Sequence, residues 1–445
     1  MGAAIGLKGL ADVLKESAPL ILAEGTSSIA WLVDTLFVSM LGDEAVAAVG
    51  VGGYGSWLAS VAMMLFYVGV IVVVSQALGG SRTEYAERVV AQSLTAAAAT
   101  GLLIAATVQV AAPYIAAAVA GTRGEVAELA AGYLRARSLG LPLLGAWLTL
   151  DAAYRAAKRN NPIMYSALAA ALTNVVLDPL LIFTLGYGVV GAGLATAVSY
   201  LPAVALLAVR SPIELGFAAR PALPGRLALH VATVGAPSIA ERVMMTLAHG
   251  FFLGSVARCG ESSLAAHTIG VRIESIAFLP AFALSTYASS VVGQLVGAGD
   301  IDGAEREGWR VAKASAALMS LGGGLLVVLS PLAPRAFGVS SAVAEQATVY
   351  LVLAGISEPF LGLVMALAGA IRGAGNTLAP SALNIVGVYA FRAAPAVVAA
   401  SRLRGGGPDC ATTIWAIMAL DLAARALVFS MVYRRYFRRL VRLVA

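Results

Sequence analysis

The sequence predicts an all-α integral membrane protein with twelve transmembrane helices in two six-helix bundles. Three observations favour this fold class: an apolar composition, twelve apolar runs of membrane-spanning length, and an internal repeat. Hydrophobic residues occupy 60% of the 445 positions and charged residues only 12%. A soluble chain of this length carries about twice that charged fraction.

The apolar runs are long enough to cross a bilayer, which takes about 20 residues per helix. In the first half they lie near 16–40, 46–78, 88–112, 126–150, 160–184 and 187–209. In the second half they lie near 227–257, 263–298, 310–333, 343–371, 376–400 and 411–433. Pro280 lies inside 263–298 and predicts a kink there. The first sixteen residues lack a signal-peptide pattern, so we expect the first helix to remain in the membrane.

An internal repeat relates the two halves. Pro19 corresponds to Pro237, an offset of 218 residues (237 − 19), and Gln76 corresponds to Gln294 at the same offset. Because six is an even number of crossings, both halves enter the membrane from the same side, and a pseudo-two-fold axis along the membrane normal relates them. We expect an N-terminal lobe at 1–209, a cytoplasmic linker at 210–226 and a C-terminal lobe at 227–445. Transporters built this way bind substrate between the halves, although a duplicated channel or membrane enzyme remains an alternative.

Positive charge alternates between the connections and predicts the topology. The basic connections contain Arg82, Arg88, Arg155, Lys158, Arg159, Arg210, Arg220, Arg226, Arg306, Arg310, Lys313 and Arg372, and Arg434, Arg435, Arg438, Arg439 and Arg442 follow the last run. The opposite connections are poorer in positive charge, with Arg402 and Arg404 as exceptions. Since basic loops stay in the cytoplasm, we expect a multi-pass protein of the cell membrane with both termini inside. The net charge of +6 therefore does not indicate nucleic-acid binding.

Two carboxylates inside apolar runs of the first half need a functional or structural reason, because such groups are costly in a membrane. Asp34 and Asp178 each lie about 18 residues into their runs, roughly 27 Å along each helix. Asn174 is one turn before Asp178 and shares its face, and Pro179 loosens the backbone after it. Buried carboxyl groups that repel each other take up protons easily, and their oxygens equally suit a sodium ion. The structural alternative is an aspartate that caps a broken helix or pairs with an arginine, but we expect no arginine at this depth in the first half.

The second half contains a different set of intramembrane charges. Glu241 lies in the seventh run, and Met244 and Met245 follow it on a face that can line a cavity. Glu274 lies in the eighth run and Glu358 in the tenth, without a predicted orientation for Glu358. A candidate second-lobe cavity is formed by Glu241, Met244, Met245 and Glu274.

Other residues favour structural roles. Asp421 and Arg425 are one turn apart in the last run and are expected to form an internal ion pair. Cys259 and Cys410 match no metal spacing and are too few for a disulfide framework, so we interpret them as small apolar residues. The sequence has no Walker motif, no G-x-S-x-G and no metal-spaced His/Cys cluster. We therefore expect neither enzyme activity nor ATP-driven transport by this chain alone, and no cofactor other than a coupling ion.

Four blocks resemble the multidrug and toxic compound extrusion (MATE) transporters. They are VDTLFVSMLGDEAVAAVG at 33–50, NVVLDPLLIFTLGYGVVGAGLAT at 174–196, LAAHTIGVRIESIAFLPAFALSTYASSVVGQLVGAGD at 264–300, and RGAGNTLAP at 372–380. The resemblance implies a V-shaped pair of six-helix bundles. Asp34 and Asp178 match the coupling acids of the prokaryotic branch that couples through its first lobe, and Asn174 and Thr196 match polar residues of that lobe. The sodium-coupled branch with acids deep in its second lobe fits less well, because Glu241 lies earlier in helix seven than its acid.

The resemblance further implies a secondary active multidrug efflux transporter. Such a protein exports organic, often cationic, compounds by alternating access, in exchange for protons or for sodium bound at Asp34 and Asp178. Its partners are a drug-like molecule and the lipid bilayer, and we expect a monomer. The alternative within the superfamily is a flippase of lipids or lipid-linked sugars, which Arg242, Arg272 and Arg392 keep open. A membrane receptor or scaffold without a transport cycle is a further class.

Overall fold

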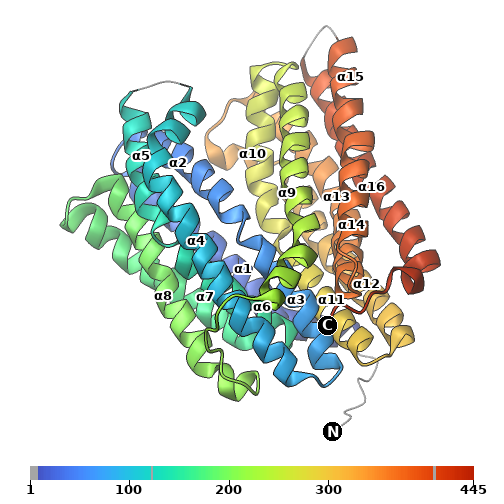
Figure 1. Cartoon of the computed structure of the whole chain (residues 1–445). Helices are drawn as coiled ribbons and strands as arrows, with labels where there is room; N and C mark the ends of the chain where they lie inside the picture. The colour runs from blue at the N-terminus through green and yellow to red at the C-terminus, as the bar shows by residue number, and fades with distance from the viewer. Residues whose placement is uncertain (1–8, 122–123, 404–406) are drawn as a thin grey trace. The chain divides into compact units, whose positions relative to one another are not determined.

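The computed structural model describes residues 9–121, 124–403 and 407–445, and every regular element in these ranges is helical. The expected all-α fold is therefore confirmed (Figure 1). Arg404, one of the two exceptions in the charge pattern, lies outside the described residues.

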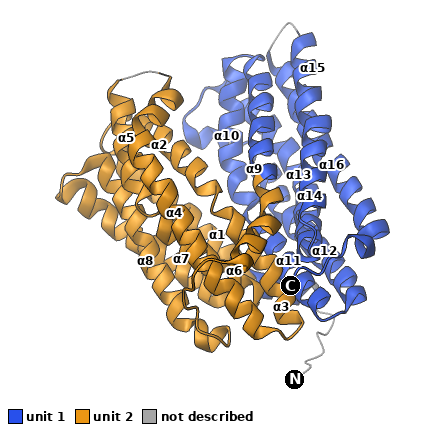
Figure 2. Cartoon of the chain, viewed as in Figure 1, with its two compact units in different colours: residues 1–17, 240–444 blue, residues 18–239, 445 orange. Residues whose placement is uncertain are grey.

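The chain forms two compact units, shown in different colours in Figure 2. Unit 2 consists of Ala18–Ile239 with the terminal Ala445, and unit 1 of the residues up to Ser17 with Ala240–Val444. The boundaries fall inside two long helices, α1 (Leu10–Ser39) and α9 (Arg226–Ala257). The predicted linker at 210–226 contains the end of α8 and a non-helical stretch within unit 2, and the predicted lobe boundaries remain predictions.

Six helical rods follow one another from α1 to the end of α8, and several are broken. After α1 they are α2 (Asp43–Val61), α3 (Met64–Gly79), α4 (Thr83–Ala120), α5 (Glu125–Ser138), α6 (Leu141–Ala156), α7 (Asn160–Pro179), the π-helical turn η1 (Leu180–Thr184) and α8 (Gly188–Glu214). The pairs α2/α3 and α5/α6 each form one interrupted rod, and η1 continues α7.

The same order of rods recurs from α9 onward. After α9 come α10 (Glu261–Ala277), α11 (Leu279–Gly297), α12 (Ile301–Leu329), the short 3₁₀ helix η2 (Pro334–Phe337), α13 (Ser341–Gly373), α14 (Leu378–Val388), the π-helical turn η3 (Tyr389–Ala393), α15 (Ala394–Arg402) and α16 (Gly407–Leu440). The kink predicted at Pro280 is a break, because α10 ends at Ala277 and Pro280 lies in the first turn of α11.

Ten helices or continuous helical rods within the described residues are long and apolar enough to cross a membrane. The predicted run 126–150 is absent from this set because α5 and α6 are both short. The helix α9 is also absent, since Glu241 and Arg242 at its centre lower its hydropathy. Each of the twelve predicted runs nevertheless coincides with one helical rod.

Candidate functional site

Close packing of α5 against α8 supports the candidate site in unit 2. A Cβ atom on Gly193 of α8 would lie 2.8 Å from the backbone oxygen of Tyr133 on α5. A Cβ atom on Gly140, at the start of α6, would lie 2.6 Å from the Cα of Ala197 on α8. Small residues at these positions let the two backbones approach, as is usual for helices in membranes. Thr196 and the side chains of α5 are thereby held on neighbouring helices.

Asp34 is buried on α1 with only 4% of its surface exposed. Its Oδ1 atom has no hydrogen-bond partner among the described residues. One turn later, Val38 packs in an apolar cluster with Tyr133 and Ile182, which belong to α5 and η1. The carboxylate therefore lies beside an apolar core, where its charge is expensive and a proton or a cation would relieve the cost.

Asn174 and Asp178 are brought together on α7, as their spacing predicts. The Nδ2 atom of Asn174 donates a hydrogen bond of 3.3 Å to Oδ1 of Asp178, whose side chain is fully buried. The other oxygen, Oδ2, has no hydrogen-bond partner among the described residues. Asp34 is close enough to Asp178 to repel it electrostatically. The two predicted coupling carboxylates thus form one site, and each offers an oxygen that no protein donor occupies.

The π-helical turn η1 follows directly from the sequence at this site. Pro179 has no N–H group, so the α-helical hydrogen-bond ladder is interrupted one residue after Asp178. The chain resumes with wider i→i+5 bonding, in which the Leu185 amide donates to the Leu180 carbonyl at 2.9 Å. Such π-helical turns are frequent at functional sites.

The expectation that no arginine lies near these acids is wrong. Arg137 of α5 interacts electrostatically with Asp34, although no hydrogen bond joins them. Its guanidinium instead donates a 2.6 Å hydrogen bond to the hydroxyl of Tyr133, one turn earlier on α5. Arg137 lies inside the predicted run 126–150, and the sequence does not show that this run is close to Asp34. The site therefore has a positive charge at its edge.

Thr196 lies on α8 and is partly buried. Its hydroxyl donates to the backbone oxygen of Ala192, one turn earlier, at 3.1 Å. One turn further on, Tyr200 interacts electrostatically with Arg137 and stacks on Trp147 with ring centroids 5.6 Å apart. Thr196 is thus on the helix that packs against α5, but the structure shows no direct hydrogen bond from Thr196 to either aspartate.

Glu241 in unit 1 is bound by three protein groups. It accepts from Arg372 at 2.7 Å, from the Ser381 hydroxyl at 2.7 Å and from the Asn384 amide at 2.6 Å. Arg372, predicted in a cytoplasmic connection, lies in the last turn of α13 and has a side chain only 16% exposed. A carboxylate with three short contacts is well compensated in its charged form.

Asp421 and Arg425 form the expected ion pair. Nε and Nη2 of Arg425 donate to the two oxygens of Asp421 at 2.8 and 2.7 Å. Arg392 of η3 also donates to Asp421, at 2.8 Å, and Nη1 of Arg425 donates to Asn384 at 3.4 Å. Arg392 is one of the arginines on which the flippase alternative rests, and it is already paired with a carboxylate.

The other residues of the candidate second-lobe cavity have protein contacts. The backbone oxygen of Met244 accepts from the Tyr389 hydroxyl at 3.1 Å, and Met245 packs in an apolar cluster with Val388. Glu274 accepts a hydrogen bond from the Tyr350 hydroxyl. Glu358 does not belong to that candidate set; it is 1% exposed, and neither of its oxygens has a hydrogen-bond partner in the described part of the chain.

The interpretation of the two cysteines as small apolar residues is wrong. Cys259 and Cys410 form a disulfide that joins the end of α9 to the first turns of α16. Both are almost fully buried in the apolar cluster of unit 1, which explains why their environment is that of small apolar residues. Two cysteines 151 positions apart give no spacing from which this pairing can be inferred.

A comparison with protein families matches the chain twice. The family model described as MatE covers residues 19–180 and 237–398. The two matches begin 218 residues apart (237 − 19), which is the offset of the internal repeat.

Named relatives align over most of their length. The chain is 30% identical over 409 residues to a protein of Burkholderia pseudomallei named "Probable multidrug resistance protein NorM", covering 85% of this chain and 83% of that protein. A protein of the same name from Thermotoga maritima is 24% identical over 393 residues, with 86% and 83% covered.

Solved structures share the fold. The Vibrio cholerae MATE transporter VcmN in its bent form superposes with a TM-score of 0.88 at 18% identity, covering 97% of each chain. A transporter of the MOP superfamily from Pyrococcus furiosus superposes with a TM-score of 0.86 at 22% identity, covering 97% of this chain and 96% of that one. Because the family matches span well over half of the sequence and the fold agrees, the chain belongs to the MatE family of membrane transporters.

Proposed function

We propose that this chain is a secondary active multidrug exporter that exchanges organic, often cationic, compounds for protons by alternating access. The observation that carries the proposal is the pair of buried carboxylates, Asp34 and Asp178, each with an oxygen that no protein donor occupies. The names of the relatives support the substrate class, since they are multidrug resistance proteins.

Protons suit this site for a physical reason. Two carboxylates that repel each other in apolar surroundings gain most when one of them is neutralised. Proton uptake would remove the repulsion and let α1 and α7 pack more closely. Proton release would favour the binding of a cation at another place in the protein. Sodium is the alternative ion, because the same oxygens together with Asn174 are suitable ligands.

The disulfide supports a topology with both termini in the cytoplasm. Disulfides form outside the reducing cytoplasm. The charge pattern predicts that the turn after α9 and the beginning of α16 lie outside, and these segments contain Cys259 and Cys410. We therefore propose this orientation, and a monomeric protein in the plasma membrane.

The test uses purified protein in liposomes preloaded with a fluorescent organic cation, with protein-free liposomes as the control. A pH gradient and a sodium gradient are imposed in separate runs. We expect cation movement under the pH gradient alone. Movement under sodium alone would make the same acids sodium ligands, and movement of a labelled lipid without the cation would instead support the flippase.

A further inference from the structure

Two ion pairs occupy corresponding places in the two repeats. Glu24 of α1 pairs with Arg155 at the end of α6, and Glu241 of α9 pairs with Arg372 at the end of α13. Both offsets are 217 residues (241 − 24 and 372 − 155), one residue short of the offset of the repeat. Each pair joins the first rod of its repeat to the fourth. The charge pattern predicts Arg155 in a cytoplasmic connection and gives no indication of a role for Glu24.

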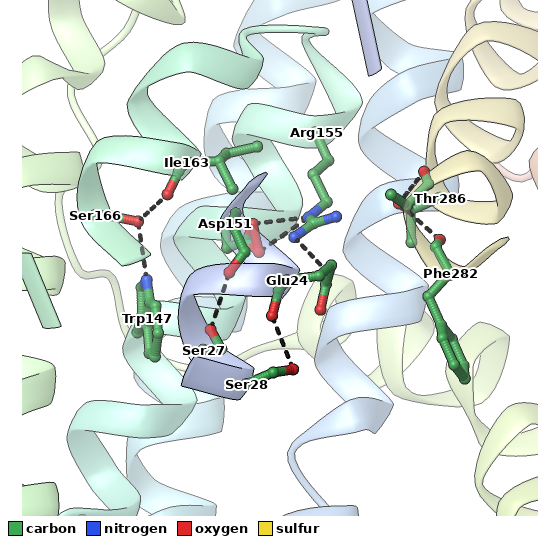
Figure 3. A network of polar contacts seen from close by, with 12 residues as sticks. Glu24, Ser27, Ser28, Trp147, Asp151, Arg155, Ile163, Ser166, Phe282 and Thr286 are labelled. Atoms are coloured by element: carbon green, nitrogen blue, oxygen red, sulfur yellow. Dashed lines mark hydrogen bonds and ion pairs between the residues drawn. The ribbon is translucent and has the colours of Figure 1, made fainter. Parts of the chain in front are cut away.

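The pair in unit 2 contains a second carboxylate, Asp151 (Figure 3). Asp151 takes the closer contacts, since Nε of Arg155 donates to its two oxygens at 3.0 and 2.8 Å. Glu24 receives a longer contact of 3.3 Å from Nη2 of the same guanidinium. The side chain of Asp151 is 9% exposed, whereas that of Glu24 is 32% exposed.

The pair in unit 1 has no second acid and more donors. The carboxylate of Glu241 accepts hydrogen bonds of 2.6 to 2.7 Å from Arg372, Ser381 and Asn384, and the Glu241 side chain is 12% exposed. A neighbouring arginine, Arg242, adds further positive potential at this carboxylate. The charged form of Glu241 is therefore compensated several times over.

This difference determines which carboxylate can change its charge. In unit 2, two carboxylates share one guanidinium, so the three groups together carry one surplus negative charge, which is costly away from bulk water. The groups that face Glu24 are Arg155 and Asp151 of α6 and the phenol of Tyr67 on α3. Tyr67 lies beneath Arg155, with the guanidinium carbon 5.7 Å from its ring centroid, and adds no charge. Of the two acids, Glu24 has the weaker contact and the better access to a proton.

We propose that Glu24 is a positioning residue of the transport cycle, a latch that loosens α1 from α6 while it is ionised and lets α1 pack against α6 when it takes up a proton. The latch rests on the proposed function, because α1 also contains the coupling acid Asp34. Glu241, its counterpart in the repeat, stays ionised and acts as a fixed anchor between α9 and α13. The reaction at Glu24 is a simple protonation, with one proton added to the carboxylate and the surplus negative charge beside Arg155 removed.

A thermal unfolding experiment tests the titration of Glu24 without any transport. The variant Glu24→Gln resembles the protonated residue, and Glu241→Gln is the matched control. We expect the melting temperatures of wild type and Glu24→Gln to converge at acidic pH and to separate as the pH rises. The difference between wild type and Glu241→Gln should persist over the same range. A constant difference for Glu24→Gln would overturn the proposal, whether or not the liposomes show export.

Hydrogen exchange and export test the release of α1. After correction for the intrinsic effect of pH on exchange, amides of α1 around residue 24 should exchange several-fold slower in the wild type at acidic than at alkaline pH. In Glu24→Gln they should exchange slowly at every pH, and the pH profile of export should flatten. Fast exchange in Glu24→Gln at alkaline pH, like that of the wild type, would show that the charge of Glu24 does not control α1, and the latch would be wrong. If the wild type exports nothing while these shifts occur, the proposed function fails and the titrating contact stands.

Discussion

Two buried acids of unit 2 and two of unit 1 have opposite surroundings. In unit 2, Asp34 and Asp178 lie beside apolar side chains, and each has an oxygen without a protein donor. In unit 1, Glu241 and Asp421 are each bound by two or more donors, including arginine. The repeat has therefore placed an uncompensated pair of acids in unit 2 and a compensated pair in unit 1, while Glu358 of unit 1 is a further buried acid whose oxygens have no hydrogen-bond partner in the described residues. We infer that an intramembrane acid is a candidate for ion coupling only when its charge is left uncompensated.

The largest effect is expected at Asp34. Asp34→Asn removes the titratable group and keeps its shape, so gradient-driven export should fall to the level of protein-free liposomes while the protein still folds and inserts. Cation efflux from liposomes measures the loss, and size-exclusion chromatography checks the fold. Normal export by this variant would remove the basis for coupling in unit 2.

The framework role of unit 1 predicts a loss of stability at Asp421. Asp421→Asn leaves Arg392 and Arg425 without their shared carboxylate, and breaking a buried pair from one side costs about 3–5 kcal/mol. Thermal unfolding in detergent should show a clearly lowered melting temperature. Asp34→Asn is the matched control, because it removes a carboxylate that no arginine binds directly, and its melting temperature should stay near that of the wild type. An unchanged melting temperature in Asp421→Asn would mean that the acids of the two units do not differ in this way.

The disulfide between Cys259 and Cys410 also lies in unit 1 and should contribute to the stability of that unit. Replacing Cys259 and Cys410 by serine should cost about 2–4 kcal/mol, because the bridge closes a long loop and restricts the unfolded chain. A reducing agent should lower the melting temperature of the wild type and leave the double variant unchanged. If the wild-type cysteines react with a thiol reagent before reduction, the bridge does not form.

The sequence predicts the rods of this fold well because the membrane imposes one strong rule. Apolar runs of spanning length must become helices, and each of the twelve runs coincides with one. Proline removes one hydrogen bond from the helical ladder, which accounts for the breaks at Pro179 and Pro280. Because α1, α4 and α13 continue through Pro19, Pro113 and Pro359, a proline alone does not predict where a helix breaks.

The pairing of charges was less predictable. Asn174 with Asp178 and Asp421 with Arg425 are local pairs one turn apart, and both are found as expected. Contacts between distant helices, such as Glu24 with Arg155, Arg392 with Asp421 and the pairing of the cysteines, depend on which helices are neighbours. A single sequence does not show which helices are neighbours. For the same reason it does not predict that Arg137 lies close to Asp34.

The smallest predicted effect concerns the hydrogen bond between Asn174 and Asp178. Asn174→Ala removes a donor that favours the ionised carboxylate, at a net cost of about 0.5–1.5 kcal/mol. Since about 1.4 kcal/mol corresponds to a tenfold change in proton affinity, the pH dependence of substrate release should move toward alkaline pH by up to about one unit. Thr196→Ala is a suitable control, because Thr196 donates to the backbone of its own helix and should leave the profile in place. An unchanged profile in Asn174→Ala would show that Asn174 and Asp178 do not share one proton, and the uncompensated site of unit 2 would then consist of the two aspartates alone.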